Sequence, residues 1–326
     1  MKPAWLVTAN SVALGGKANA RIDSIQYHDA TGDEADQLVV EFDDHDNSLQ
    51  IPPTGAELSL MLGWAGSALH DKGTFVVDEA EHTGSPDKIT ITARSADFRE
   101  AFRVKRSTSW DAGTSLQDLL TTIASRYKLS AKVGATLATI SLQQVTQSGE
   151  SDSNLLNRLG KQHDAVATVK NGFLLFFPKG QGTTAGGNLL PSATIERQQT
   201  TDHSYKKVDK KTAFTGVQAH WYDNDAAAQK TVLAGSAGNL KKLRTALPDN
   251  QQATEAANAE WQRIQRGAAT MSLTIAPGSP ELVNGQPITL NGWKTAIDAH
   301  QWLIDDLHHN IAGGGLITQV ELVTQA

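Results

Sequence analysis

Hydrophobic residues recur at every second position along much of the first hundred residues. The runs 38–42 and 89–93 show this period clearly, with Leu38, Val40 and Phe42 in the first of them. A period of two places one face of a strand on a core and the other toward water or a partner. Turn-forming residues separate the runs at Thr31-Gly32-Asp33, Pro52-Pro53-Thr54-Gly55, Asp71-Lys72-Gly73 and Gly84-Ser85-Pro86-Asp87. Many short strands at this spacing predict a β-sandwich or a β-barrel.

The pattern changes to helical spacing after Gly113. Thr114 is expected to cap a helix, and Gln117 stands where it completes a capping box. The hydrophobic face of this helix consists of Leu116, Leu119, Leu120, Ile123, Ala124 and Tyr127. A second short helix is expected from Ser151 or Asp152, with Leu155, Leu156 and Leu159 facing inward. The runs 165–170 and 173–178 flank Asn171-Gly172, a dipeptide typical of two-residue hairpins. These elements predict a small α/β domain.

Strand patterns return from about residue 190, with one helix among them. Strands are expected within residues 212–222, 270–276, 287–290, 302–307 and 316–323. Asp249 is the expected N-cap of the helix, and Gly267 is the glycine expected after its end. The predicted fold is therefore mixed and mainly β (α+β). We expect domains at residues 1–110 (β), 111–180 (α/β) and 190–326 (β with one helix), with a flexible linker at 181–189.

Composition and charge exclude several classes of protein. The chain has no cysteine, which excludes disulfides, thiolate nucleophiles and cysteine-ligated metals. Its formal net charge is −6, and no block of five or six like charges is present, so we expect no nucleic-acid recognition. No apolar run approaches the ~18–20 residues that a membrane helix needs. We therefore expect no membrane insertion by this chain.

Two clusters of carboxylates and imidazoles are candidates for metal binding. They are Asp43-Asp44-His45-Asp46 and Asp305-Asp306-Leu307-His308-His309. Adjacent residues of a strand point to opposite faces, whereas a metal needs converging ligands. The first cluster also lacks the glycine and the distal glutamate of a calcium loop. We interpret both clusters as polar surface or turn residues and name no metal ligand.

Motifs for catalysis or cofactor binding are incomplete. Gly278-Ser279-Pro280 fails the nucleophile-elbow pattern, and Gly15-Gly16-Lys17 lacks the glycine spacing of a P-loop. A glycoside hydrolase would need two carboxylates across a cleft. Glu100, near Phe98 and Phe102, and Glu260, beside Trp261, are the acids we considered for that role, and packing explains both. We therefore expect no enzyme, no catalytic residue and no cofactor.

The last third of the chain carries a series of motifs in a characteristic order. They are Gly216-Val217-Gln218-Ala219-His220-Trp221-Tyr222-Asp223, Arg263-Ile264-Gln265-Arg266-Gly267, Pro277-Gly278-Ser279-Pro280-Glu281-Leu282 and the glycine-rich segment from Gly313 to Leu322. In this order they resemble the late control D family of contractile-tailed phages, whose members are baseplate hub proteins. The middle domain, with Asn154-Leu155-Leu156 and Asn171-Gly172, is also similar to that family.

The resemblance implies a fold and a set of partners. It implies two β-barrel-like hub domains per chain, as in the N-terminal part of VgrG, arranged around an axial channel. Three chains would form a homotrimer with a pseudo-sixfold face that joins the tail tube to the spike. Implied partners are the tail tube protein, the spike protein and the tape-measure protein. The implied location is the virion tail baseplate of a phage or related injection device, after assembly in the host cytoplasm.

Two alternative functions are open at the level of sequence. Residues 113–129 have the rhythm of a LysM repeat, which would make the chain a peptidoglycan-binding tail protein. The second helix and the following hairpin depart from the strand–helix–helix–strand order of LysM. A tail-associated cell-wall lysin is the other alternative. Retention on purified cell walls would distinguish the binding protein, and loss of turbidity of a wall suspension would distinguish the lysin.

Overall fold

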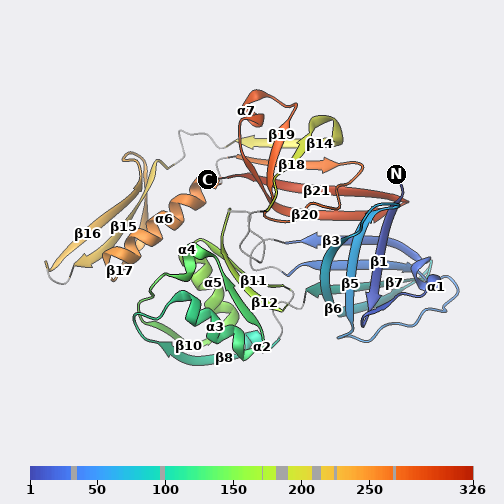
Figure 1. The fold of residues 1–326 in the computed structure, drawn as a ribbon, viewed down its shortest axis with the longest axis horizontal. Helices are drawn as coiled ribbons and strands as arrows, with labels where there is room; N and C mark the ends of the chain where they lie inside the picture. The colour runs from blue at the N-terminus through green and yellow to red at the C-terminus, as the bar shows by residue number, and fades with distance from the viewer. Residues whose placement is uncertain are drawn as a thin grey trace.

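The chain folds into a mainly β protein with several separate cores (Figure 1). The computed structural model describes residues 1–30, 35–95, 100–170, 172–180, 190–207, 214–223, 226–266 and 269–325. Strands account for 52% and helices for 19% of the structure, which confirms the predicted mixed, mainly β class. The expected linker at 181–189 and the expected turn at Thr31-Gly32-Asp33 lie outside the described residues.

One large sheet brings together strands from both ends of the chain. From the first part of the chain it takes β1 (Pro3–Ala9), β2 (Val12–Ala13), β3 (Ile22–Asp29), β4 (Gln37–Asp43), β5 (Glu57–Trp64), β6 (His70–Thr83) and β7 (Lys88–Ser95). From the last part it takes β13 (Ala193–Glu196), β14 (Thr200–Lys207), β18 (Ala269–Ile275), β19 (Pro287–Asn291), β20 (Trp302–Ala312) and β21 (Gly315–Thr324). Short helices α1 (Gly16–Asn19), η2 (Arg197–Gln199) and α7 (Thr295–Asp298) flank these strands.

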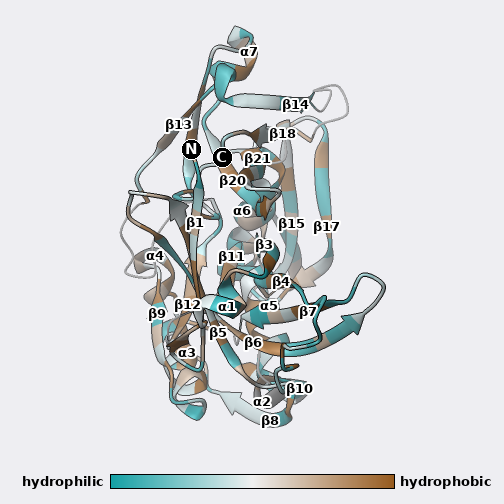
Figure 2. Cartoon of the chain, turned by 90° about the vertical axis from the view of Figure 1, so that its right-hand side faces the viewer, coloured by the Kyte–Doolittle hydropathy of each residue, from teal (hydrophilic) through white to brown (hydrophobic). Residues whose placement is uncertain are grey.

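The order of these strands is β14-β18-β21-β20-β3-β4-β7-β6-β5-β1-β2, with β19 and β13 branching from β20. Among the described strands the sheet ends at β14 and at β2 and does not close on itself. A closed barrel is therefore not confirmed. Alternating hydrophobic and hydrophilic bands are visible along several long strands in Figure 2, as expected for strands with one buried face.

The large sheet carries two hydrophobic cores. The first is built from β1 and β3–β7, with Phe75 and Leu60 among its fully buried side chains. It also takes in Ile311 and Leu316 from the tip of the β20–β21 hairpin. The second is built from β13, β18–β21 and α7, around the fully buried Trp302. We call these the first and second β units.

The middle of the chain forms a separate α/β unit. It contains α2 (Glu100–Arg103), β8 (Lys105–Trp110), α3 (Leu116–Arg126), β9 (Ser130–Val133), α4 (Ala135–Ala138), β10 (Val145–Ser151), α5 (Asp152–Gln162), β11 (Ala165–Lys170) and β12 (Phe173–Pro178). The β11–β12 hairpin has the predicted bounds, although Asn171 itself lies outside the described residues. The core of this unit includes Phe102 and Trp110, which precede the expected domain start at residue 111.

The caps of the two middle helices differ in how well the sequence predicted them. The expected cap at Thr114 is wrong by one residue, because Ser115 caps α3. Its hydroxyl accepts from the Asp118 backbone N–H at 3.1 Å and donates to the Asp118 carboxylate at 2.6 Å. This reciprocal pair is a contact that Thr114, one residue earlier, does not make. The predicted start of α5 is confirmed, with Ser151 as its N-cap.

A buried carboxylate joins the elements of the middle unit. Asp152, the first residue of α5, is fully buried. Its carboxylate accepts hydrogen bonds from Arg126 at 2.7 Å, Tyr127 at 2.6 Å and Gln147 at 2.7 Å. Arg106 lies 3.4 Å away. Because these partners come from α3, its end, β10 and β8, the network ties both helices to the β8–β10 pair.

A smaller sheet and the longest of the described helices form a fourth unit, at the left of Figure 1. Strands β15 (Gly216–Asp223), β16 (Ala228–Gly235) and β17 (Leu240–Leu247) pair in the order β16-β15-β17, and α6 (Asn250–Arg266) packs against them. The Asp249 carboxylate accepts from the Gln252 backbone N–H at 2.8 Å, which confirms the predicted cap. Gly267 lies outside the described residues. No helix in the described ranges combines the length and apolar character that crossing a membrane requires.

Candidate functional site

The two ends of the chain meet where β3 pairs with β20. The strands are antiparallel, and His308 lies directly opposite His28. Side chains strengthen this seam. The buried Lys72 ammonium donates to the Leu282 carbonyl at 2.9 Å. The Asn284 backbone N–H donates to the Asp29 carboxylate at 3.0 Å. The seam therefore holds the first and second β units together by main-chain and side-chain bonds.

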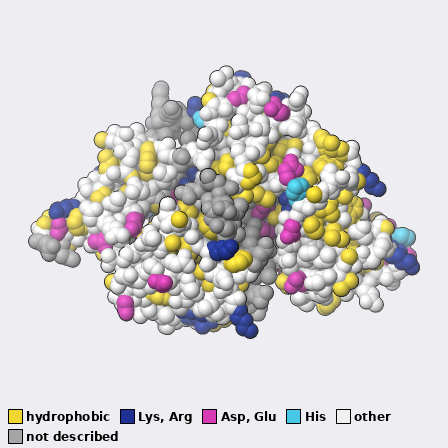
Figure 3. All heavy atoms as spheres, viewed as in Figure 1, with side chains coloured by type: hydrophobic (Ala, Val, Ile, Leu, Met, Phe, Trp, Pro, Cys, Tyr) yellow, Lys and Arg dark blue, Asp and Glu magenta, His cyan; other side chains and the backbone are white. Residues whose placement is uncertain are grey.

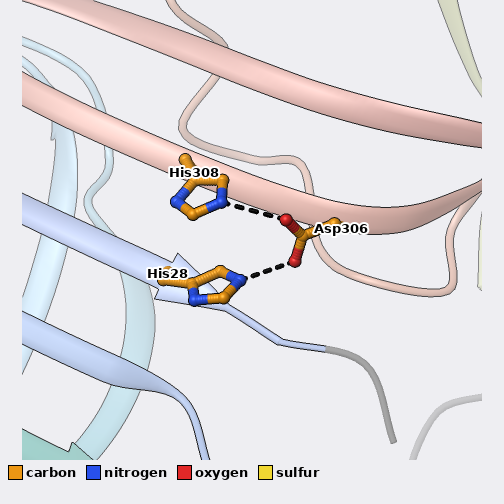
Figure 4. A group of neighbouring side chains, drawn as sticks. All are labelled: His28, Asp306 and His308. Atoms are coloured by element: carbon orange, nitrogen blue, oxygen red, sulfur yellow. Dashed lines mark hydrogen bonds and ion pairs between the residues drawn. The ribbon is translucent and has the colours of Figure 1, made fainter. Parts of the chain in front are cut away.

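A cluster of three polar side chains lies on one face of this seam (Figure 4). The Asp306 carboxylate is 2.6 Å from His28 Nε2 and 2.9 Å from His308 Nε2. The two imidazoles are stacked, with ring centroids 4.0 Å apart and planes inclined by 10°. One carboxylate thus holds two parallel imidazoles, and all three side chains are partly exposed.

The second metal candidate from the sequence, Asp305 to His309, is divided between the two faces of β20. His308 is exposed and His309 is buried, as expected for neighbours on a strand. His309 Nδ1 lies 2.9 Å from Thr318 Oγ1, and burial lowers the pKa of His309 to about 3. Leu307 faces the core, and desolvation raises the pKa of the Asp305 carboxyl. The structure brings Asp306 and His308 together and separates them from His309.

The cluster Asp43 to Asp46 forms a turn after β4. Asp44 is fully buried and accepts from the backbone N–H groups of Ser48 and Leu49, each at 3.0 Å. Asp46 pairs with Arg21, and this guanidinium holds the pKa of the Asp46 carboxyl well below its usual range. Hydrogen bonds from His45 lower the pKa of Asp43. These carboxylates are occupied in closing the turn and pairing with Arg21.

Of the two acids considered for a hydrolase, the structure describes the side-chain contacts of Glu260 only. Glu260 is engaged by the Lys241 ammonium at 2.6 Å and by the Arg263 guanidinium at 2.8 Å. Glu100 begins α2, but its side chain lies outside the described part, as does Phe98. Ser279 lies after β18, where its backbone N–H donates to Thr318 Oγ1 at 2.9 Å. Gly15-Gly16-Lys17 begins the one-turn helix α1.

The surface offers features suited to association. The large sheet ends at β2 and β14, two strand edges that intramolecular pairing does not cover within the described residues. Exposed hydrophobic side chains include Val12 on β2, Leu6 on β1 and Ile317 on β21. Figure 3 shows hydrophobic side chains gathered over the right-hand part of the molecule, where the first β unit lies. Unpaired edges and clustered apolar surface are features that partners commonly cover.

Comparison with known proteins identifies the family of this chain. Residues 21–315 match the family described as phage tail baseplate hub (GPD). The chain belongs to this family. A probable baseplate hub protein of Escherichia phage 186 is 37% identical over 363 aligned positions, which cover 99% of this chain and 93% of the relative.

Solved structures share the fold of this chain. The 43 kDa tail protein of prophage MuSo2 from Shewanella oneidensis has a TM-score of 0.68 at 15% identity, with 98% of each chain covered. The E. coli c3393 protein has a TM-score of 0.59 at 11% identity, covering 98% of this chain and 77% of that chain. That protein is a component of the type VI secretion system with structural similarity to the T4 tail proteins gp27 and gp5.

Family membership confirms the resemblance derived from the motifs of the last third. This baseplate hub is a structural, non-enzymatic protein of the phage tail. Sequence reasoning did not single out His28, because it lies 278 residues from Asp306 and has no carboxylate neighbour on its own strand face. Only the β3–β20 pairing connects them. Knowledge of that pairing is the signal that would have identified the cluster.

Proposed function

We propose that this hub acts as a homotrimeric ring that joins the sixfold tail tube to the threefold spike. The observation that carries the proposal is the pair of β units. Each has its own core, and both are held on one continuous sheet by the β3–β20 seam. Two β units per chain would let three chains present six units around an axis, which would reconcile the two symmetries. In this assembly the β units serve as the barrel-like hub domains.

Strand edges give the ring a physical means of closing. β14 and β2 lie at opposite ends of the sheet, and both carry largely exposed residues. In a ring, the edge at one end of a protomer meets a neighbouring protomer, which hides main-chain groups that would otherwise invite uncontrolled pairing. Such contacts form a closed ring only if the rotations that relate neighbouring protomers add up to a full turn. Otherwise they form an open filament.

The partners follow from this position in the tail. The tail tube protein stacks on one face of the ring, the spike protein is mounted on the other, and the end of the tape-measure protein occupies the axis. The protein assembles with them in the host cytoplasm before it becomes part of the virion. Its action is mechanical, because the ring closes the tube until the spike leaves.

Co-purification with the spike protein of the same tail tests this proposal. The untagged hub is co-expressed with a tagged spike, and the composition of the complex is measured by native mass spectrometry. We expect three hub chains bound to one spike trimer. Other ratios, or a spike that never retains the hub, would overturn the proposed junction.

A pair of variants tests the edge contact. Val12→Lys places a charge at the β2 edge, and Val104→Lys places the same charge on another exposed valine, in the middle unit; these valines are 69% and 52% exposed. We expect Val12→Lys to lower the fraction of trimer and Val104→Lys to leave it unchanged. Equal behaviour of the two variants would show that the β2 edge is not covered in the ring.

Wall binding by the middle unit is a second candidate, because one observation favours it. β8 and β10 pair antiparallel and enclose α3 and α4 between them in sequence, which is the strand–helix–helix–strand order of LysM, with β9 added. The test is retention of the purified hub on insoluble peptidoglycan. Retention that Val104→Lys or other changes in this unit reduce would support binding, and complete recovery in the supernatant would exclude it.

A further inference from the structure

The seam between β3 and β20 assembles a set of metal-ligating atoms that no single segment of the chain contains. Asp306 and His308 are two residues apart on β20 and share a face, and His28 lies opposite His308 on β3. The ligand atoms of these three residues all lie within 4.8 Å of one another. We propose that His28, Asp306 and His308 bind a divalent first-row transition metal ion of the Zn²⁺ class.

The donor set selects this class of ion. Two imidazole nitrogens and one carboxylate oxygen suit Zn²⁺ and its neighbours, whereas Ca²⁺ and Mg²⁺ prefer oxygen ligands alone. Three protein ligands leave a position for water, which the partial exposure of the three side chains permits. Binding requires neutral imidazoles, so the ion replaces the hydrogen bonds to Asp306 and displaces any protons that occupy the two Nε2 atoms.

The parallel stacking of the two imidazoles favours the binding of one ion by both rings. His28 and His308 direct their Nε2 atoms to the two oxygens of the same carboxylate, so both Nε2 atoms already point to one side of the stack (Figure 4). An ion placed there would be reached by side-chain rotations that open the two short hydrogen bonds to Asp306. The main chain, fixed by the β3–β20 ladder, holds the ligands in place.

Two other histidine–carboxylate pairs in the described residues lack either a third ligand or a close contact. His45 and Asp43 lie 2.9 Å apart but form only a pair, and Arg21 stands nearby. The His82–Asp44 contact is longer, at 3.7 Å, and shares Asp44 with Arg21. Within the part of the chain that the structure describes, the seam cluster is the one group of three such residues with converging atoms.

A bound ion would link parts of the chain that are distant in sequence. Its ligands come from the first and the second β unit, so the ion adds a bond across the contact that unites them. A ligand that binds only the folded state stabilises it by a free energy that grows with the logarithm of the ratio of ligand concentration to Kd. Metal would therefore protect β3 and β20 against opening and make the two β units behave as a single body. This inference depends on the seam and stands independently of the proposed trimer.

Metal titration of the untagged full-length protein tests the proposal. Zn²⁺ is titrated in competition with a chromophoric chelator, and Co²⁺ is added in a parallel sample to report coordination through its visible absorption. We expect one equivalent of Zn²⁺ per chain, and visible Co²⁺ bands of the intensity typical of four- or five-coordinate sites. Absence of stoichiometric Zn²⁺ binding would overturn the proposal.

Variants locate the site and separate binding from folding. Asp306→Asn keeps the shape of the side chain, and His308→Ala removes one ligand; we expect each to weaken Zn²⁺ binding by at least about tenfold. The matched control is His45→Ala, which removes a histidine from an exposed pair with Asp43 and is expected to bind like the unmodified protein. Hydrogen exchange supplies a second readout, because Zn²⁺ should slow exchange in β3 and β20 of the unmodified protein and not of Asp306→Asn. Equal affinities in all variants would place the metal elsewhere and refute the assignment.

Discussion

The buried carboxylate of Asp152 gives the sharpest prediction for the middle unit. Replacing Asp152 by alanine removes the acceptor of three short hydrogen bonds, from Arg126, Tyr127 and Gln147. It also leaves the Arg126 guanidinium, which is 19% exposed, without its carboxylate. Removing one partner of a buried ion pair costs about 3–5 kcal/mol, because the remaining charge is left uncompensated. We expect this cost for Asp152→Ala.

Asp152→Asn should cost less than the alanine variant. The amide keeps an oxygen that can accept from Arg126 and Gln147, and the Tyr127 hydroxyl can turn to accept from the new NH₂ group. What remains is the loss of the negative charge opposite Arg126. We expect roughly half the cost of Asp152→Ala, since charged hydrogen bonds contribute about 1.5–3 kcal/mol.

Amide hydrogen exchange, read peptide by peptide, measures this cost within the middle unit. A loss of about 3–5 kcal/mol corresponds to exchange roughly 100- to 4,000-fold faster in α5 and β10. The control is Glu150→Ala, which removes the more exposed 2.8 Å ion pair with Arg158 in the same unit. Exposed pairs contribute about 0.2–1 kcal/mol, so exchange should accelerate by less than about sixfold. Similar acceleration in Asp152→Ala and Glu150→Ala would refute the argument that burial of the carboxylate sets the cost.

Three further predictions concern one more residue of the middle unit and one residue in each of two other units. Burial lowers the pKa of His163 to about 4, so folded protein resists a protonation that the unfolded chain accepts near pH 6.5. The contribution of neutral His163 to stability is complete above pH 6.5 and declines as the pH falls toward 4. His163→Leu should therefore make Tm fall less steeply between these pH values than in the unmodified protein. An equally steep fall of Tm in both proteins would contradict this prediction. In Gly216→Ala the added Cβ would lie 2.6 Å from the Ala234 carbonyl oxygen, so thermal unfolding should show a loss of about 1–3 kcal/mol, whereas Gly15→Ala meets open space and should change little; equal midpoints would contradict the close approach. Trp302→Ala empties the second core and should cost about 3–5 kcal/mol in urea unfolding, and a loss below about 1 kcal/mol would show that the core does not depend on it.

Local patterns in the sequence predicted the elements whose signals are local. The β11–β12 hairpin appeared with its predicted bounds, because apolar runs on both sides of Asn171-Gly172 leave little choice of register. The helices α5 and α6 begin at the expected caps. The start of α3 was shifted by one residue, because Thr114 and Ser115 are both good caps and only the contact with Asp118 distinguishes them.

Other features could not be predicted because their causes are not local. β16 carries mostly exposed residues and β17 has no buried residue, so the hydrophobic alternation that marks a strand is weak in them. β17 pairs in parallel with β15, and no turn motif in the sequence predicts this contact. The β3–β20 seam joins residues 278 positions apart, and the His28–Asp306–His308 cluster exists only through it. A strand reveals which of its residues share a face but not which strand lies beside it.

The absolute mass of the purified hub in solution tests the central claim most directly. Light scattering on a sizing column gives this mass without assumptions about shape. The proposed ring predicts a mass near three times the 34.9 kDa of one chain, either for the hub alone or for the hub component of its complex with the spike. A hub that stays a monomer at high concentration and also on the spike would contradict the ring.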